Sequence, residues 1–237
     1  MLSPVTDTRL RLFLALAAIV GVSLVRARAA RWGSTATEGT MTLAGDDLVP
    51  HPDLETTRAI TIGADVDDVW PWLVQMGQGR GGLYSYDRLE NLVGCDIHSA
   101  DRIVEEWQAV EVGSQVRLAP EMALDVAVAD PPKALVLHGS GDVPTGSAAA
   151  PMIAPFDFSW AFTLHPAPEG GTRLVVRERY GYLRWWAALV VEPASVASSV
   201  MTRQMLRGIR RRSEDRVRAA PSSGSSGSAA GPGPGRP

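Results

Sequence analysis

Residues 63–108 constrain the fold of this chain most, because their pattern places a helix directly after a strand. Apolar side chains recur there at helical spacing and predict an amphipathic helix. They are Val66, Val69, Trp70, Leu73 and Val74. Asp65 is the expected N-cap, and the glycine-rich residues 77–82 end the helix. β-Branched residues at 56–62 predict the preceding strand, and residues 84–92 predict a second short helix.

From residue 110 onward, apolar and polar residues alternate, as they do in half-buried strands. The clearest strand has an apolar residue at every second position, namely Phe156, Phe158, Trp160, Phe162 and Leu164. Glu169-Gly170-Gly171 is typical of a hairpin turn and leads into a further strand over residues 172–182. Short turns between consecutive strands predict an antiparallel sheet.

A long helix is predicted to close the domain. Pro193 suits the first position of this helix, which we expect to continue to Arg218. Its core-facing stripe is expected at Val190, Ala194, Ala197, Met201 and Met205. Arginines concentrate in its second half, where their charge complements the helix dipole.

The composition fits one domain with appendages. The chain has 237 residues, 45% of them hydrophobic, which is ample for one core. Its net charge of −3 lacks the basic surplus of a nucleic-acid-binding domain, so we expect no nucleic-acid partner. A single cysteine, Cys95, excludes an internal disulfide framework. Asp96, His98 and Asp101 lack the spacing of a metal site and have no second histidine nearby, so we expect neither metal nor cofactor.

The two ends of the chain lie outside the predicted domain, residues 53–218. An uninterrupted apolar run at 12–25, flanked by arginines, covers about 21 Å as a helix, less than the ~30 Å of a hydrocarbon core. It fits an uncleaved membrane anchor, a cleaved signal peptide or a core helix. We take residues 1–31 as an anchor or signal segment, with residues 10–28 contacting the membrane.

This interpretation predicts a single-pass membrane protein. Arginines are slightly more numerous after the apolar run than before it, which favours a cytoplasmic domain. Residues 32–52 contain turn signals and are expected to form a linker. Residues 219–237 are rich in Ser, Gly and Pro and are expected to be disordered. Nothing in the sequence specifies an oligomeric state.

Three stretches carry a resemblance to a known family. Residues 69–73 read Val-Trp-Pro-Trp-Leu, Phe158-x-Trp160-x-Phe162 alternates in a late strand, and an amphipathic helix closes the domain. With the order of elements, they resemble the START-like, or helix-grip, superfamily over residues 53–218. The similarity is greatest to actinobacterial SRPBCC proteins, grouped as polyketide cyclase/dehydrase and lipid-transport members.

The resemblance implies an α+β fold in which a curved antiparallel sheet surrounds a long C-terminal helix, with two short helices after the first strand. It also implies a cavity for an apolar ligand between the sheet and that helix. No catalytic residue is implied, because members share no invariant catalytic set.

The residues expected to contact such a ligand come from the predicted loops, strands and last helix. They are Tyr84, Tyr86, His98, Phe158, Trp160, Glu178, Tyr180, Met201 and Met205. Glu178 shares a strand face with apolar residues, where burial would raise its pKa and suit it for acid–base catalysis. The alternative is that Glu178 pairs with a neighbouring arginine and serves the structure only.

Three functions remain open. The first, which we favour, is a membrane-tethered protein that binds a hydrophobic small molecule or lipid in the cavity. The second is a cavity enzyme of the polyketide cyclase/dehydratase type, and the third is a non-catalytic regulatory domain with a collapsed cavity. The chain has only four histidines, and no Ser-His-Asp or Cys-His arrangement shows a recognisable spacing, which disfavours an enzyme.

Overall fold

The computed structural model describes residues 21, 23–140 and 156–219, which form an antiparallel sheet packed against helices. The strands are β1 (Leu54–Ile62), β2 (Gln115–Ala119), β3 (Met122–Asp130), β4 (Ala134–Ser140), β5 (Phe156–Pro166) and β6 (Thr172–Tyr182). The helices are α2 (Val66–Val74), α3 (Asp87–Leu92), the short 3-10 helix η1 (Glu105–Trp107) and α4 (Ala187–Ala219). Hydrogen bonds join the described strands in the order β1-β6-β5-β4-β3-β2.

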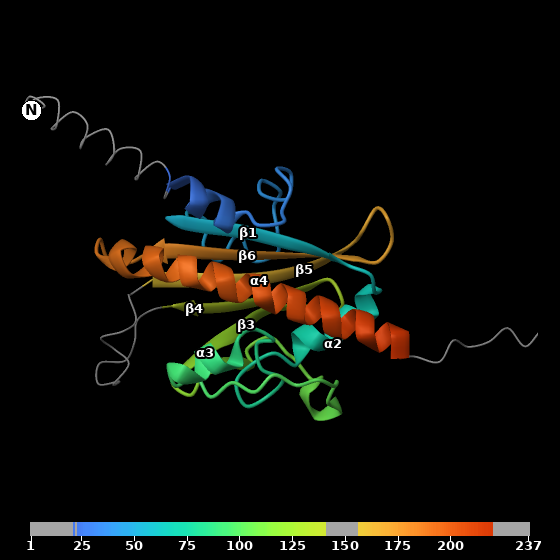
Figure 1. Cartoon of the computed structure of the whole chain (residues 1–237). Coiled ribbons are helices and arrows are strands. Elements are labelled where there is room, and N and C mark those ends of the chain that lie inside the picture. Colours follow the sequence, from blue (N-terminus) through green and yellow to red (C-terminus); the bar gives the residue numbers. More distant parts are fainter. Residues whose placement is uncertain (1–20, 22, 141–155, 220–237) are drawn as a thin grey trace, which may run out of the picture.

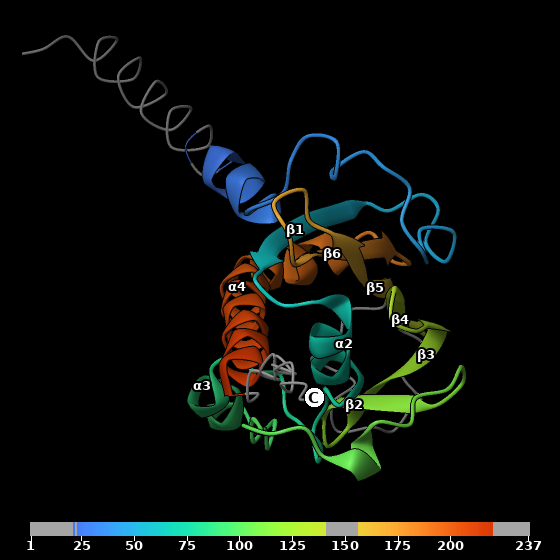
Figure 2. The ribbon, with the colours of Figure 1, turned by 90° about the vertical axis from the view of Figure 1, so that its right-hand side faces the viewer.

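The sheet curves around α4, which runs across its inner face (Figures 1 and 2). Strands β2 to β6 are neighbours in chain order, and β1 completes the sheet by pairing antiparallel with β6. Gly170 and Gly171 turn the chain between β5 and β6 with φ angles of 94° and 78°, which glycine adopts without steric cost. The predicted α+β helix-grip architecture, with short helices after the first strand, is confirmed.

The main core lies between the inner face of the sheet, α2 and the C-terminal half of α4. Leu164 and Val176 of the sheet belong to the same buried cluster as Leu73 of α2 and Leu206 and Ile209 of α4. The alternation on β5 and β6 directs every second side chain toward the helices, as the sequence predicts. This core fixes α4 against the sheet and so positions the side chains that lie between α4 and the sheet.

The two longer helices form as predicted, with differences at their starts. Asp65 occupies the N-cap position of α2 but makes no side-chain capping hydrogen bond, and Pro71 lies inside the helix. α4 begins at Ala187, so Pro193 lies inside it instead of at its first position. Ala187 and Val191 are buried against the ends of β5 and β6, and this packing offsets the backbone hydrogen bond that proline removes.

The buried stripe of α4 is rotated from the expected one. Val190, Ala194 and Ala197 are exposed, whereas the hydroxyl residues Ser195 and Ser199 are buried. Sequence reasoning placed apolar side chains toward the sheet. In the structure, a cluster of polar side chains on the sheet faces this part of α4, and hydroxyl groups of the helix form hydrogen bonds with it.

Residues 32–52 were expected to be a linker. Trp32 packs against α4, and the residues after it pack on the outer face of β1 and β6, on the side away from α4 (Figure 2). We call residues 33–49 the N-terminal strap. Leu43 of the strap is buried against Val175. Arg177 on the same outer face is 3% exposed and donates to the Asp46 carboxylate at 2.6 Å. The outer face of these two strands is therefore covered by the chain itself.

The predicted single-pass membrane anchor is contradicted. Within residues 21, 23–140 and 156–219, no helix is both long enough and apolar enough to span a bilayer. Most of the apolar run at 12–25, and nearly all of the predicted tail, lie outside the described residues. The physical reason against the anchor is length, because the run falls short of the ~30 Å that a spanning helix must cover. The expected membrane location depended on the anchor and is contradicted with it.

Candidate functional site

An aromatic wall lines the inner face of the sheet near the start of α4. The wall comprises Phe156, Phe158 and Trp160 of β5 and Tyr180 of β6. The ring centroids of Phe158 and Tyr180, which lie opposite each other in the register, are 4.6 Å apart. Those of Phe158 and Trp160 are 6.4 Å apart, within the range of favourable aromatic contacts. Phe158 is only half-buried, so the wall offers apolar surface to another molecule.

A buried ion pair lies next to the aromatic wall. Glu178 of β6 lies opposite Trp160, and its Oε1 is 2.8 Å from Nη1 of Arg58 on β1. The two side chains are 2% and 0% exposed. Arg58 also donates from Nη2 to the Ser199 hydroxyl at 2.8 Å and from Nε to the Ala29 carbonyl at 3.2 Å. An unpaired charge at this depth costs several kcal/mol, so each group needs the other.

Three hydroxyl groups complete the coordination of Glu178. Thr202 of α4 donates to Oε1 at 2.9 Å, while Thr56 and Tyr180 donate to Oε2 at 3.3 Å each. Burial and the neighbouring Glu178 carboxylate raise the pKa of Tyr180 well above its usual value, so its hydroxyl stays protonated and donates. The network joins β1, β6 and α4, and it explains why α4 turns hydroxyl groups toward the sheet.

Trp160 carries a hydrogen-bond donor without a partner. The residue is 8% exposed, and its buried Nε1 has no acceptor among the described residues. Leaving a buried donor unmet costs about 1–3 kcal/mol, and buried polar groups almost always have a partner. A bound molecule with an acceptor group would satisfy this nitrogen.

Tyr84 lies against the C-terminal half of α4. Its hydroxyl donates to the Trp72 carbonyl at 3.0 Å, and the Arg212 guanidinium lies 4.8 Å from its ring centroid. Burial raises the pKa of the Tyr84 phenol above its usual value. A side chain at Gly208 would come within 2.2 Å of the Tyr84 carbonyl oxygen, so glycine is what permits this approach. These contacts tie the loop before α3 to α4.

The remaining predicted site residues are distributed between the surface and the core. Tyr86 is exposed, and His98 is an exposed side chain 3.7 Å from the Asp96 carboxylate. Met201 is half-buried on α4, where its carbonyl accepts a hydrogen bond from Ser85. Met205 is 2% exposed and belongs to the main core. The structure therefore brings together Phe158, Trp160, Glu178 and Tyr180, and it places Tyr86 and His98 at the surface.

Sequence reasoning missed the polar partners of Glu178. They are Arg58, Thr56, Ser199 and Thr202. A signal for Arg58 exists in the sequence, because it occupies an inward position two residues before Ile60, on a strand face whose other residues are apolar or threonine. The serines and threonine of α4 had no comparable signal, since such residues are common on exposed helix faces.

Comparison with known proteins finds similarity only among solved structures. No protein-family profile and no curated protein sequence matches the chain. The chain is similar to a Rhodobacter sphaeroides protein, with 17% identity and a TM-score of 0.42 over 72% of this chain and 95% of that one. It is similar to a Polyketide_cyc-like protein of Corynebacterium glutamicum, with 14% identity and a TM-score of 0.33 over 71% and 96% of the respective chains. A protein of the dynemicin biosynthetic locus matches with 15% identity and a TM-score of 0.37 over 66% and 47%.

At these identities and TM-scores, no property of these proteins is carried over to this chain. The order of elements and the curvature of the sheet around α4 are properties of this chain's own structure, and they give it an α+β helix-grip architecture.

Proposed function

We propose that this protein binds a hydrophobic small molecule or lipid that carries a hydrogen-bond acceptor. The ligand would lie on the aromatic wall, between the inner face of the sheet and the N-terminal half of α4. The observation that carries the proposal is the buried Nε1 of Trp160, which has no hydrogen-bond partner among the residues that the structure describes, beside the half-buried ring of Phe158. An apolar surface with one unmet donor suits a ligand that is mostly apolar and has one polar group.

The energetics of the aromatic wall are consistent with binding. Phe158 is already half-buried, so completing its burial contributes about half of the ~1.5–3 kcal/mol that full burial of such a side chain contributes. A ligand acceptor at Trp160 would add the benefit of satisfying a buried donor, about 1–3 kcal/mol. The half-buried thioether of Met201 on α4 is flexible and polarisable, which suits contact with ligands of varied shape.

The arrangement of Glu178 favours binding over catalysis. Its carboxylate accepts from Arg58, Thr202, Thr56 and Tyr180 at once. A general base needs a free lone pair within reach of the substrate proton. Here the lone pairs are engaged by the fold, so Glu178 acts as the counter-charge of Arg58. Cyclisation or dehydration would need a different acid–base group.

The test combines co-purification with the removal of one hydrogen-bond donor. Native mass spectrometry of protein purified from its host should reveal an apolar molecule bound in a one-to-one complex. Trp160→Phe keeps an aromatic ring and removes the donor, so it should weaken binding of that molecule about tenfold. Trp185→Phe is the matched control, because Trp185 is 86% exposed. Equal binding by both variants, or no bound molecule and no uptake of a lipophilic dye, would exclude the proposal.

A further inference from the structure

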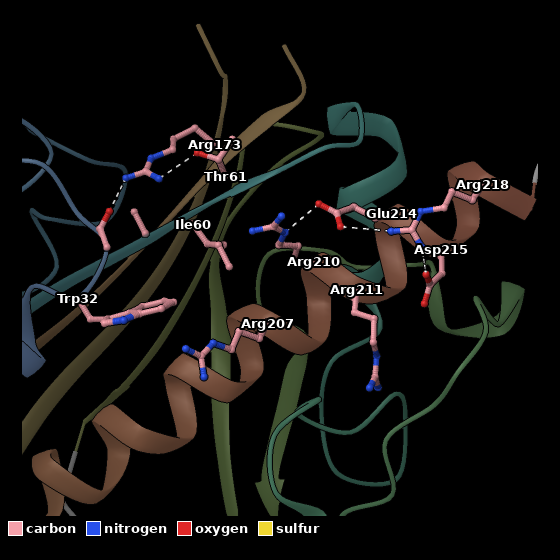
Figure 3. A pocket seen from close by; sticks show the side chains of 12 residues that line it. Trp32, Ile60, Thr61, Arg173, Arg207, Arg210, Arg211, Glu214, Asp215 and Arg218 are labelled. Atoms are coloured by element: carbon pink, nitrogen blue, oxygen red, sulfur yellow. Dashed lines mark hydrogen bonds and ion pairs between the residues drawn. The ribbon is translucent and has the colours of Figure 1, made fainter. Parts of the chain in front are cut away.

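A groove lies on the molecular surface between β1 and the C-terminal half of α4 (Figure 3). We call it the Trp32 groove. Trp32 and Ile60 line one side, and Arg207, Arg210 and Glu214 of α4 line the other. Its volume of about 780 Å³ falls within the range of small-molecule sites, about 300–1,000 Å³. The aromatic wall contributes no residue to it.

Two arginines lie over the same indole ring: Arg207, which lines the groove, and Arg203, which lies one helical turn before it on α4. The guanidinium carbons of Arg203 and Arg207 lie 5.2 and 5.5 Å from the centroid of the Trp32 ring. The two residues are one helical turn apart, and like charges at that spacing repel each other. The electron-rich face of the indole attracts both cations. Because the face of an indole ring offers no conventional hydrogen-bond acceptor, this contact leaves the N–H groups of both guanidinium groups free to donate.

Arg203, Arg207 and the neighbouring Arg211 form no ion pair within the part of the chain that the structure describes, whereas Arg210 and Arg173 do. Arg210 is 2.8 Å from Glu214, and Arg173, across the groove, is 2.6 Å from Glu38. Within residues 21, 23–140 and 156–219, no carboxylate forms an ion pair with Arg203 or Arg207. The Nε of Arg203 is also buried without a hydrogen-bond partner in this part of the chain. The unpaired positive charge at the groove thus lies at Arg207 and Arg211, which line it, and at Arg203 beside Trp32.

We infer that the Trp32 groove binds the phosphate group of a small phosphoester. A carboxylate has two oxygens and matches one guanidinium fork. Two forks one helical turn apart are better matched by a doubly charged group with three or more oxygens, which a phosphate monoester provides. Trp32 and Ile60 offer apolar contact for the organic part of the ligand. The shared chemistry, a phosphate on an organic group, is found in soluble phosphoesters and in lipid headgroups.

Calorimetric titration with inorganic phosphate and pyrophosphate tests this inference on the full chain. Saturable binding is expected, with a Kd in the range of about 0.1–1 mM. Arg207→Gln should weaken it about tenfold, because a charge-assisted hydrogen bond is lost. Arg184→Gln is the matched control for charge, since Arg184 is exposed on the segment before α4, and it should change the Kd less than about twofold. Acetate at the same ionic strength should not bind detectably.

Arg207 is exposed, so its replacement should leave the melting temperature unchanged, and a lost signal can be assigned to the site. Trp32→Phe should abolish the part of the tryptophan fluorescence change that phosphate causes. Absent saturation with both probes, or equal binding by Arg207→Gln and wild type, would overturn the inference, as would acetate binding as well as phosphate does. Separate titrations with glycerol phosphate and with a short-chain phosphatidic acid distinguish the two sources of the phosphate. The compound with the lower Kd shows whether the groove prefers a soluble phosphoester or a lipid headgroup.

Discussion

Arg58 on the edge strand β1 and Glu178 on β6 form an ion pair at 2.8 Å, buried beneath α4. The pair lies where the sheet and α4 face each other, and hydroxyl groups from both sides complete its hydrogen bonding. It therefore specifies which face of α4 packs on the sheet.

Removing the charge of Glu178 should destabilise the protein strongly. In Glu178→Gln, the buried Arg58 guanidinium loses its counter-charge, and we expect the free energy of unfolding to fall by about 3–5 kcal/mol. Urea denaturation followed by circular dichroism measures this change. Glu121→Gln, an exposed position, should change stability by less than about 0.5 kcal/mol.

Replacing both partners separates the charge effect from general disruption of the site. The double variant Arg58→Met/Glu178→Met should recover much of the lost stability, because two apolar side chains leave no unpaired charge. A double variant as unstable as Glu178→Gln would show that shape, and not charge, is what the fold requires there.

A larger side chain at Met201 should block binding of a ligand between the sheet and α4. Met201→Trp adds volume at a half-buried position on α4, and we expect loss of lipophilic-dye binding with unchanged or raised stability. Overpacking a filled core costs about 1–3 kcal/mol, so the melting curve distinguishes the two situations. Val200→Trp, at an exposed neighbouring position, is the control and should bind dye like the parent. If the parent does not bind dye and Met201→Trp is strongly destabilised, then Met201 belongs to an ordinary packed core.

Stability should fall as the pH rises through the range in which Glu90 ionises. Burial, with a contribution from Asp87, raises the pKa of Glu90 from 4.5 to about 7. Between about pH 4.5 and about pH 7 the folded state retains a proton that the unfolded state releases, so folding becomes less favourable as the pH increases.

The melting temperature measured across this pH interval checks the effect. Glu90→Gln cannot ionise and should lose less stability than the parent over the same interval. Glu106→Gln, an exposed carboxylate of the adjoining 3-10 helix, should follow the parent. Parallel pH profiles for the parent and Glu90→Gln would contradict the raised pKa.

The N-terminal strap should detach when its ion pair is removed. Asp46→Ala deprives the buried Arg177 of its hydrogen-bonded carboxylate at 2.6 Å, leaving Glu55 at 3.9 Å, and it deprives the Leu43 backbone N–H of its acceptor at 2.9 Å. We expect faster amide hydrogen exchange over residues 33–49 and a loss of about 2–4 kcal/mol. Asp47→Ala, at the adjacent exposed position, should leave the exchange pattern unchanged. Unaltered exchange in Asp46→Ala would show that apolar contacts alone hold the strap.

The fold could be predicted from the sequence where local periodicity decides it. The alternation on β5, the glycine turn before β6 and the helical spacing of α2 depend on residues close together in the chain, and all three are observed. The inward orientation of Glu178 followed from the same alternation. Such features need no knowledge of distant contacts.

The site could not be predicted where distant contacts decide it. Arg58 and Glu178 are 120 positions apart, so nothing local to either residue identifies its partner. The buried face of α4 was predicted from apolar residues, but the polar pair selects hydroxyls instead. The strap was expected to be a linker because turn residues surround its few apolar ones, and only the sheet beneath it reveals that Leu43 is buried.

The pairing of β1 with β6 has a consequence for the chain as it is synthesised. Thr56 and Glu178 face each other across this pair and are 122 positions apart. At a translation rate of about 5–20 residues per second, β1 leaves the ribosome roughly 6–25 s before its partner exists. During that interval, only water or a chaperone can hydrogen-bond to the backbone of β1 and to the charged side chain of Arg58. Among the described strands, β1 therefore waits longest for its partner, and β6, the last of them to be synthesised, supplies it.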